Sequence, residues 1–253
     1  MNQHGNQDSR IQSAFEVHNS PTLTSQYVEY FNDLKSNAWT GVTLQPKHIQ
    51  PWASPTAPTV DITSFTPKGT GSGSSDDLAD IVNSVDCSNV DHRTLYVANP
   101  SFSGRDALRQ ALVNALNDGC TVKVAVATCS DEKYVETAPV SGAGHLFHPD
   151  VVRSVVPVAS GLSETFASHD KLILVDARLR NASGTYSLRH AVFSSTQDFS
   201  DGFYTSGGNA TLGYDDAHST DASSVWSFYM QHWSQIMARA TPQSASPVDN
   251  DCP

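Results

Sequence analysis

Residues 168–176 read Ser-His-Asp-Lys-Leu-Ile-Leu-Val-Asp, which places His169, Lys171 and Asp176 at H-x-K-x-x-x-x-D spacing. The apolar, β-branched run within this stretch predicts a strand. Because side chains alternate between the two faces of a strand, His169 and Lys171 would share a face, with their Cα atoms roughly 7 Å apart. Leu172 and Leu174 would be buried on the opposite face. Asp176 has the parity of that opposite face, so we expect a bend or the end of the strand near it.

The residue types of this stretch are suited to phosphate chemistry. A histidine attacks or transfers a proton near neutral pH, a lysine supplies a fixed positive charge, and a carboxylate orients or balances them. The pattern therefore predicts a site for phosphoryl transfer. The alternative is a strand at the margin of the core whose polar ends are simply solvated.

The stretch resembles the H-K-D motif of the phospholipase D superfamily. In that family a second strand follows and ends in a G-S-x-N-like turn, and residues 190–197 occupy the corresponding place. Ser195 matches the family serine, Ser194 replaces the glycine, and Gln197 replaces the asparagine but keeps an amide that can donate to a phosphate oxygen. Residues 208–211 read Gly-Asn-Ala-Thr where the family usually has an acidic pair.

The resemblance implies a phosphodiesterase that works through a phosphohistidine, without a metal or another cofactor. It implies that His169 is the nucleophile or the general acid and that Lys171 holds the phosphoryl oxygens. Asp176 would tune the site, and Ser195 and Gln197 would assist phosphate binding. The sequence itself has no C-x-x-C motif or local His/Cys cluster that would indicate zinc.

The region before the motif predicts a β-α-β unit. Residues 94–98 have the composition of a strand, and Ser103 is the expected N-cap of a helix with Asp106 in its first turn. Apolar residues at helical spacing continue to Leu116, Gly119 would end the helix, and residues 122–127 would form the next strand. A right-handed β-α-β unit predicts an α/β fold with a mixed, mostly parallel sheet flanked by helices.

The chain as a whole resembles the end of one phospholipase D-like repeat followed by a complete second repeat. Residues 1–36 would be the terminal strand and helix of the preceding repeat, and residues 37–75, rich in Pro, Thr, Gly and Ser, an irregular linker. Residues 76–240 would form the repeat itself, and residues 241–253 a flexible tail. We therefore expect one substantial α/β core.

The family's active site usually joins two H-K-D motifs, whereas this chain has one. Either a second copy of the chain or a missing upstream half would supply the other motif, and residues 1–36 favour the missing half. Met1 is followed by polar residues rather than by a basic patch and an apolar run, so the chain shows no signal peptide.

Charge and cysteine content narrow the substrate and the compartment. A formal net charge of -11 does not favour a stable nucleic-acid partner, because binding to nucleic acid needs a basic track. We therefore expect a phospholipid substrate. The 4 cysteines form an even set in a lysine-poor chain, so we expect disulfides and a secreted protein, in a mature or truncated form. Three pairings are open.

The resemblance therefore favours a phospholipase D-like phosphodiesterase, a hydrolase with a role in lipid degradation. One alternative is a catalytically silent scaffold or binding module, since Ser194, Gln197 and Ala210 depart from the family pattern. Another is a nuclease-type phosphodiesterase that acts as a dimer. For Lys171→Ala, we expect weaker phosphate binding without loss of stability, because the lysine would face the edge of the core.

Overall fold

The computed structural model describes residues 13, 16–40, 59–66, 76–126, 131, 134–135, 151–154, 169–180, 184–196, 198–200, 209–216, 218 and 221–242. Its larger helices are α1 (Pro21–Thr40), α2 (Asp77–Asn83), α3 (Asp106–Asn117) and α6 (Val225–Arg239). The strands of the main sheet are β1 (Thr59–Thr66), β2 (Val85–Asp86), β3 (Thr94–Asn99), β5 (Thr121–Val126), β6 (Val151–Ser154), β7 (Leu172–Arg180), β8 (Tyr186–Ser195), β10 (Asn209–Asp215) and β11 (Ala240–Pro242). A small second sheet pairs β4 (Phe102–Ser103) with β9 (Phe199–Ser200).

The apolar run of the 168–176 stretch forms the first half of β7, inside the sheet. All four residues from Leu172 to Val175 are buried, because helices cover both faces of the sheet. Two predictions about this strand are wrong. His169 and Lys171 precede β7 rather than lying on it, and β7 continues through Asp176 to Arg180. Pairing with both β3 and β8 holds Asp176 in the strand.

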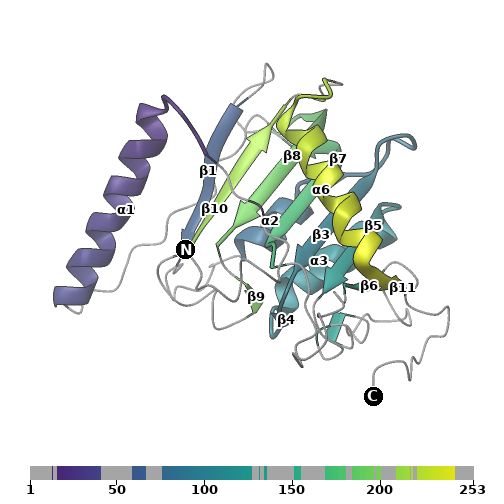
Figure 1. The fold of residues 1–253 in the computed structure, drawn as a ribbon, viewed down its shortest axis with the longest axis horizontal. Helices are drawn as coiled ribbons and strands as arrows, with labels where there is room; N and C mark the ends of the chain where they lie inside the picture. The colour runs from purple at the N-terminus through teal and green to yellow at the C-terminus, as the bar shows by residue number, and fades with distance from the viewer. Residues whose placement is uncertain are drawn as a thin grey trace, which may run out of the picture.

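The two faces of the sheet carry different helices. Ile173 and Val175 belong to the core that includes α2 and α3, whereas Leu172 and Leu174 pack with the aromatic face of α6. In Figure 1, α6 lies in front of the sheet and α2 and α3 lie behind it. Trp226 of α6 is buried in this second core.

The α/β class is confirmed, but the sheet is mostly antiparallel, so the prediction of a mostly parallel sheet is wrong. Its strand order is β1-β10-β8-β7-β3-β5-β6-β11, with β2 paired to β7. Only β3 with β5 and β5 with β6 are parallel within the described part of this sheet. The β-α-β unit β3-α3-β5 is as predicted, but β7 and β8 are joined by a short connection that permits only antiparallel pairing.

The boundaries of α2 and α3 agree only in part with the sequence-based expectations. Asp76 is the N-cap of α2 and accepts hydrogen bonds from two backbone N–H groups. Helix α3 ends before Gly119, whose positive φ of 90° suits a glycine. The expected N-cap of α3, Ser103, instead belongs to β4, and Arg105 is the N-cap without a side-chain bond to the helix.

The amino-terminal region contributes a helix and an edge strand. Helix α1 is as predicted, but residues 16–20 are not a strand. The predicted irregular segment, residues 37–75, contains the end of α1 and strand β1, which pairs antiparallel with β10. The alternating pattern of residues 59–63 outweighs the Pro, Gly and Ser content of its surroundings. Figure 1 shows α1 beside this edge of the sheet. No helix among the described residues is both long and apolar enough to cross a membrane.

A disulfide joins Cys87, after β2, to Cys120, before β5. The expectation that the chain contains disulfides is therefore confirmed, and one bonded pair is Cys87 with Cys120. The two other cysteines, Cys129 and Cys252, lie outside the described residues. The bond ties the residues that lead into two core strands across a separation of 33 residues.

Replacing both Cys87 and Cys120 by serine should lower the free energy of unfolding by roughly 3 kcal/mol, because the bond restricts the unfolded chain over a loop of this length. Urea unfolding monitored by far-UV circular dichroism would measure the change. Addition of a reductant to the wild-type protein should lower its stability by a comparable amount and leave the double variant unchanged. Equal midpoints for wild type and variant would contradict the expectation.

Candidate active site

His169 and Lys171 meet at the entrance to β7. The Nζ atom of Lys171 lies 3.2 Å from Nδ1 and 3.3 Å from Nε2 of His169, and it donates to the backbone oxygen of His169 at 3.0 Å. The prediction that these two side chains lie together is confirmed. Both residues lie in the segment that precedes the strand rather than on the strand itself.

A row of polar residues crosses neighbouring strands at this end of the sheet. Ala98 of β3 pairs with Leu172 of β7, so Asn99 and Lys171 lie one residue beyond that pair. On the other side, the backbone N–H of Ser195 donates to the oxygen of Lys171 at 2.8 Å. Thr211 of β10 is the register partner of Ser195, and its hydroxyl donates to the Ser195 hydroxyl at 3.1 Å. Thus β3, β8, β10 and the segment before β7 each contribute a polar group to one end of the sheet.

Asn99 combines two roles in this row. Its side-chain oxygen accepts from the backbone N–H of Ser101 at 2.9 Å and of Phe199 at 3.1 Å. Its amide nitrogen, in a residue that is 1% exposed, has no hydrogen-bond partner among the described residues. A buried amide N–H₂ without an acceptor is costly, so an anion bound beside Lys171 would satisfy it.

Asp198 balances the charge of Lys171. One carboxylate oxygen lies 3.0 Å from the Lys171 ammonium, and the two side chains are 18% and 10% exposed. Lys171 is therefore largely buried and paired, which differs from the edge-facing lysine expected from the sequence. Removing its charge would leave a carboxylate in a poorly solvated place.

Asp170, between His169 and Lys171 in sequence, anchors the motif to α6. Its carboxylate lies 2.7 Å from Nε2 of His232, and both side chains are buried. Its other oxygen accepts from the backbone N–H of Ser13 at 2.8 Å and from the Ser13 hydroxyl at 2.7 Å. These contacts fix the position of the segment in front of β7, which carries His169 and Lys171.

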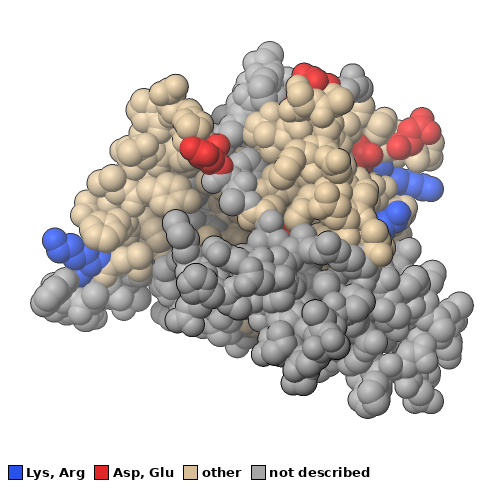
Figure 2. Space-filling model, viewed as in Figure 1, with Lys and Arg blue, Asp and Glu red and all other residues tan. Residues whose placement is uncertain are grey.

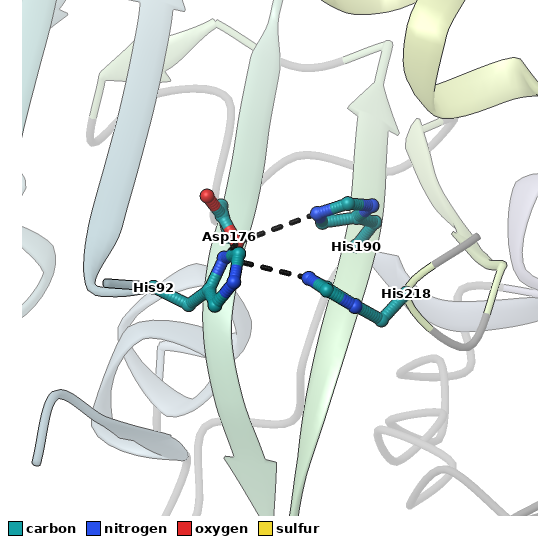
Figure 3. Close-up of side chains that lie close together, drawn as sticks. All are labelled: His92, Asp176, His190 and His218. Carbon is teal, nitrogen blue, oxygen red and sulfur yellow. Dashed lines mark hydrogen bonds and ion pairs between the residues drawn. The ribbon is translucent and has the colours of Figure 1, made fainter. Parts of the chain in front are cut away.

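Asp176 lies outside this site. It lies five positions after Lys171, which corresponds to roughly 16 Å along an extended chain. Its carboxylate instead lies 2.8 Å from Nδ1 of His92 and 3.4 Å from Nε2 of His190 (Figure 3). The expectation that Asp176 tunes the His169 site through direct contact is therefore wrong, because the straight strand β7 places Asp176 away from His169.

Two pKa values are displaced in the group around Asp176. Burial would raise the pKa of Asp176, but hydrogen bonds from His190 and His92 hold it below its ordinary value. Burial lowers the pKa of His218, and the neighbouring His190 and His92 lower it further. This group contains three imidazoles and one carboxylate, a set of ligands that suits a transition metal.

The structure brings together three of the predicted site residues, His169, Lys171 and Ser195, while Gln197 lies outside the described residues. Sequence reasoning missed Asn99 and Asp198. A signal for Asn99 was present, since it is the polar residue that ends an apolar strand of a β-α-β unit. Asp198 had no comparable signal, because the connection after β8 determines its place.

No protein-family model and no curated protein matches this chain. Among solved structures, NucT from Helicobacter pylori is similar with a TM-score of 0.47 and 13% identity, over 66% of this chain and 88% of that chain. Nuc from Salmonella typhimurium, described as a phospholipase D family member, is similar with a TM-score of 0.44 and 14% identity, over 74% of this chain and 99% of that chain. Both similarities are too low to assign an activity to this chain.

Proposed function

We propose that this protein is a phosphodiesterase of phospholipase D type in which His169 forms the covalent intermediate. The observation that carries the proposal is the contact between the His169 ring and the Lys171 ammonium at the polar end of the sheet. The resemblance of residues 168–176 and 190–197 to the phospholipase D motif supports the same chemistry. Ser195 and the buried amide of Asn99 support binding of a tetrahedral anion there.

The proposed reaction has two balanced steps. In the first, a neutral ring nitrogen of His169 attacks phosphorus, and the P–O bond to the leaving group breaks as the P–N bond forms. The leaving oxygen takes a proton from a second acid. In the second step, water attacks phosphorus, the P–N bond breaks, and the proton from that water returns to the second acid.

The ammonium of Lys171 would offset the negative charge that grows on the phosphoryl oxygens in both steps. Asp198 keeps that ammonium in place, and the contact with the His169 backbone oxygen keeps it beside the ring. The second acid would be the His169 of another copy of this chain, or a histidine of an upstream half. A dimer in solution would favour the first source.

For the substrate, we propose a phospholipid. A net charge of -11 supports this choice over a long nucleic acid, whose binding needs a basic track. On the described surface visible in Figure 2, the lysine and arginine side chains are few and lie in separate places. We also propose export to an oxidising compartment, a proposal that the Cys87–Cys120 disulfide supports.

The activity can be tested with bis(p-nitrophenyl) phosphate, phosphatidylcholine vesicles and a single-stranded oligonucleotide, each in the presence of a chelator. We expect hydrolysis of the chromogenic diester and of phosphatidylcholine, and a loss of both in His169→Ala. Hydrolysis of the oligonucleotide alone would contradict the phospholipid proposal and indicate that the protein is a nuclease. Equal background rates for wild type and variant on all three substrates would contradict the enzyme proposal and indicate a catalytically silent scaffold or binding module. Size-exclusion chromatography with light scattering would show whether the active species is a dimer.

Replacing Lys171 by methionine should lower kcat/KM by about 100-fold or more, because the charge opposite the phosphoryl oxygens is lost. It should also lower the free energy of unfolding by about 1 to 3 kcal/mol, since Asp198 is left without its cation. The double variant Lys171→Met/Asp198→Asn separates the two effects. It should regain most of the stability but none of the activity, as measured by urea unfolding and diester hydrolysis. Recovery of activity in the double variant would contradict a direct role for the ammonium.

A further inference from the structure

Three histidines and one aspartate converge on one face of the sheet, far from His169. We call them the histidine cluster: His92, Asp176, His190 and His218 (Figure 3). Asp176 and His190 are register partners on β7 and β8, at the centre of the sheet. His92 comes from the segment before β3, and His218 from the segment between β10 and α6. One ligand atom of each residue lies within 4.8 Å of all the others.

Two of the distances between these atoms agree with the edges of a metal tetrahedron. Zinc bonds to nitrogen and oxygen are about 2.0–2.2 Å long, which places tetrahedral ligand atoms roughly 3.3–3.6 Å from one another. Nε2 of His190 lies 3.4 Å from the Asp176 oxygen, and Nε2 of His218 lies 3.4 Å from Nδ1 of His92. The third distance, 2.8 Å between His92 and Asp176, is that of a hydrogen bond. It would lengthen by a few tenths of an ångström once a metal replaced the shared proton.

The surroundings hold the His190 ring as a ligand would be held. The ring stacks on Trp226 of α6, with centroids 4.6 Å apart and an interplanar angle of 9°, and the His218 ring covers it at 4.1 Å. On its other nitrogen, Nδ1, a carboxylate oxygen of the buried Asp216 lies 3.9 Å away. This separation is longer than a hydrogen bond, so the stacking on Trp226 and the contact with His218 are what hold the ring.

The backbone at His218 is strained in favour of the cluster. Its φ of 65° lies in the left-handed region, where a residue other than glycine costs on the order of 1 kcal/mol or more. Among the described residues, only Asn19 shares this property outside the glycines. A strained backbone persists where the surrounding structure holds the residue in place. At His218 the imidazole contacts the rings of His92 and His190.

We propose that the histidine cluster binds one zinc ion, with His92, Asp176, His190 and His218 as its four ligands. Three imidazoles and one carboxylate suit Zn²⁺ and neighbouring transition metals, whereas Mg²⁺ and Ca²⁺ prefer oxygen ligands alone. The four ligands come from residues 92, 176, 190 and 218, so only the folded chain assembles the site.

The metal would be structural rather than catalytic. It lies at the middle of β7, roughly 16 Å along the chain from Lys171, which precedes the strand. Its bonds would fasten the segment before β3 and the segment before α6 to the two central strands. Zinc should therefore raise stability, while the chemistry at His169 proceeds without it.

The test uses the full-length protein after dialysis against a chelator. Zn²⁺ is titrated in competition with a chromogenic indicator, Co²⁺ absorption reports the geometry, and thermal unfolding is followed with and without Zn²⁺. We expect one equivalent of Zn²⁺ with a dissociation constant at or below the micromolar range, the intense visible bands of tetrahedral Co²⁺, and a higher melting temperature. Binding weaker than that range, or a stoichiometry unrelated to one site, would overturn the proposal.

Three variants assign the site. His218→Ala removes a ligand from a partly exposed segment, and Asp176→Asn removes the ligand charge at nearly constant shape. Both should weaken Zn²⁺ binding at least about 100-fold and lose the Co²⁺ bands. His18→Ala is the matched control, because His18 is an exposed histidine 3.0 Å from the carboxylate of Glu16, and it should bind as wild type does. Unchanged binding in both His218→Ala and Asp176→Asn would place the metal elsewhere and overturn the assignment.

Discussion

Replacing His169 by alanine is expected to reduce phosphodiester hydrolysis by at least about 10⁴-fold, the largest effect on activity that we predict. The loss follows from the role proposed for the imidazole, since alanine cannot form the P–N bond that the His169 ring beside Lys171 would form. The measurement is the initial rate on bis(p-nitrophenyl) phosphate under single-turnover and steady-state conditions. A covalent phosphoenzyme, trapped by denaturation at alkaline pH because phosphohistidine is labile in acid, should appear in the wild type and be absent in the variant.

The variant should keep its fold, because His169 is half-buried and the segment that carries it is fixed by Asp170 through His232 and Ser13. Equal melting temperatures for wild type and His169→Ala would show this. The matched control is His18→Ala, which removes an exposed histidine and should retain full activity. A His169→Ala protein with more than about a tenth of the wild-type rate would exclude covalent catalysis by this residue.

Local sequence patterns predicted the elements of the fold better than their pairing. Helix α3 and its flanking strands β3 and β5 follow from apolar spacing and from Gly119, which are signals within about 30 residues of one another. The direction of pairing in the rest of the sheet depends on where the chain re-enters it. Strand β7 lies beside β3 although more than 70 residues separate them, and it runs antiparallel to it.

The candidate site shows the same division between local and distant information. His169 and Lys171 are two residues apart, so their spacing predicts their contact. Asp176 belongs to the same motif in sequence, but a straight strand separates it from them. Asn99 and Asp198 reach Lys171 only through the strand order and the connection after β8, which no local pattern contains.

The largest effect on stability is expected at Arg105, the residue before α3. Its guanidinium donates to Asp76 through Nε at 2.6 Å and through a second nitrogen at 2.8 Å, and that second nitrogen also donates to Asp77 at 3.0 Å. All three side chains are at most 4% exposed. Asp76 also caps α2, so one arginine joins the starts of α2 and α3 on the same face of the sheet.

Replacing Arg105 by methionine should lower the free energy of unfolding by about 3 to 5 kcal/mol, because two carboxylates would remain buried without their cation. Urea unfolding by circular dichroism and fluorescence would measure the loss. The matched control is Arg178→Met, which breaks a 2.7 Å pair with Asp86 whose side chains are 37% and 24% exposed, and which should cost less than about 1 kcal/mol. Adding Asp77→Asn to Arg105→Met should restore part of the loss, since one of the two unpaired charges disappears while the Asp76 cap is kept. If Arg105→Met and Arg178→Met had equal costs, burial would not be what makes the Arg105 pair strong.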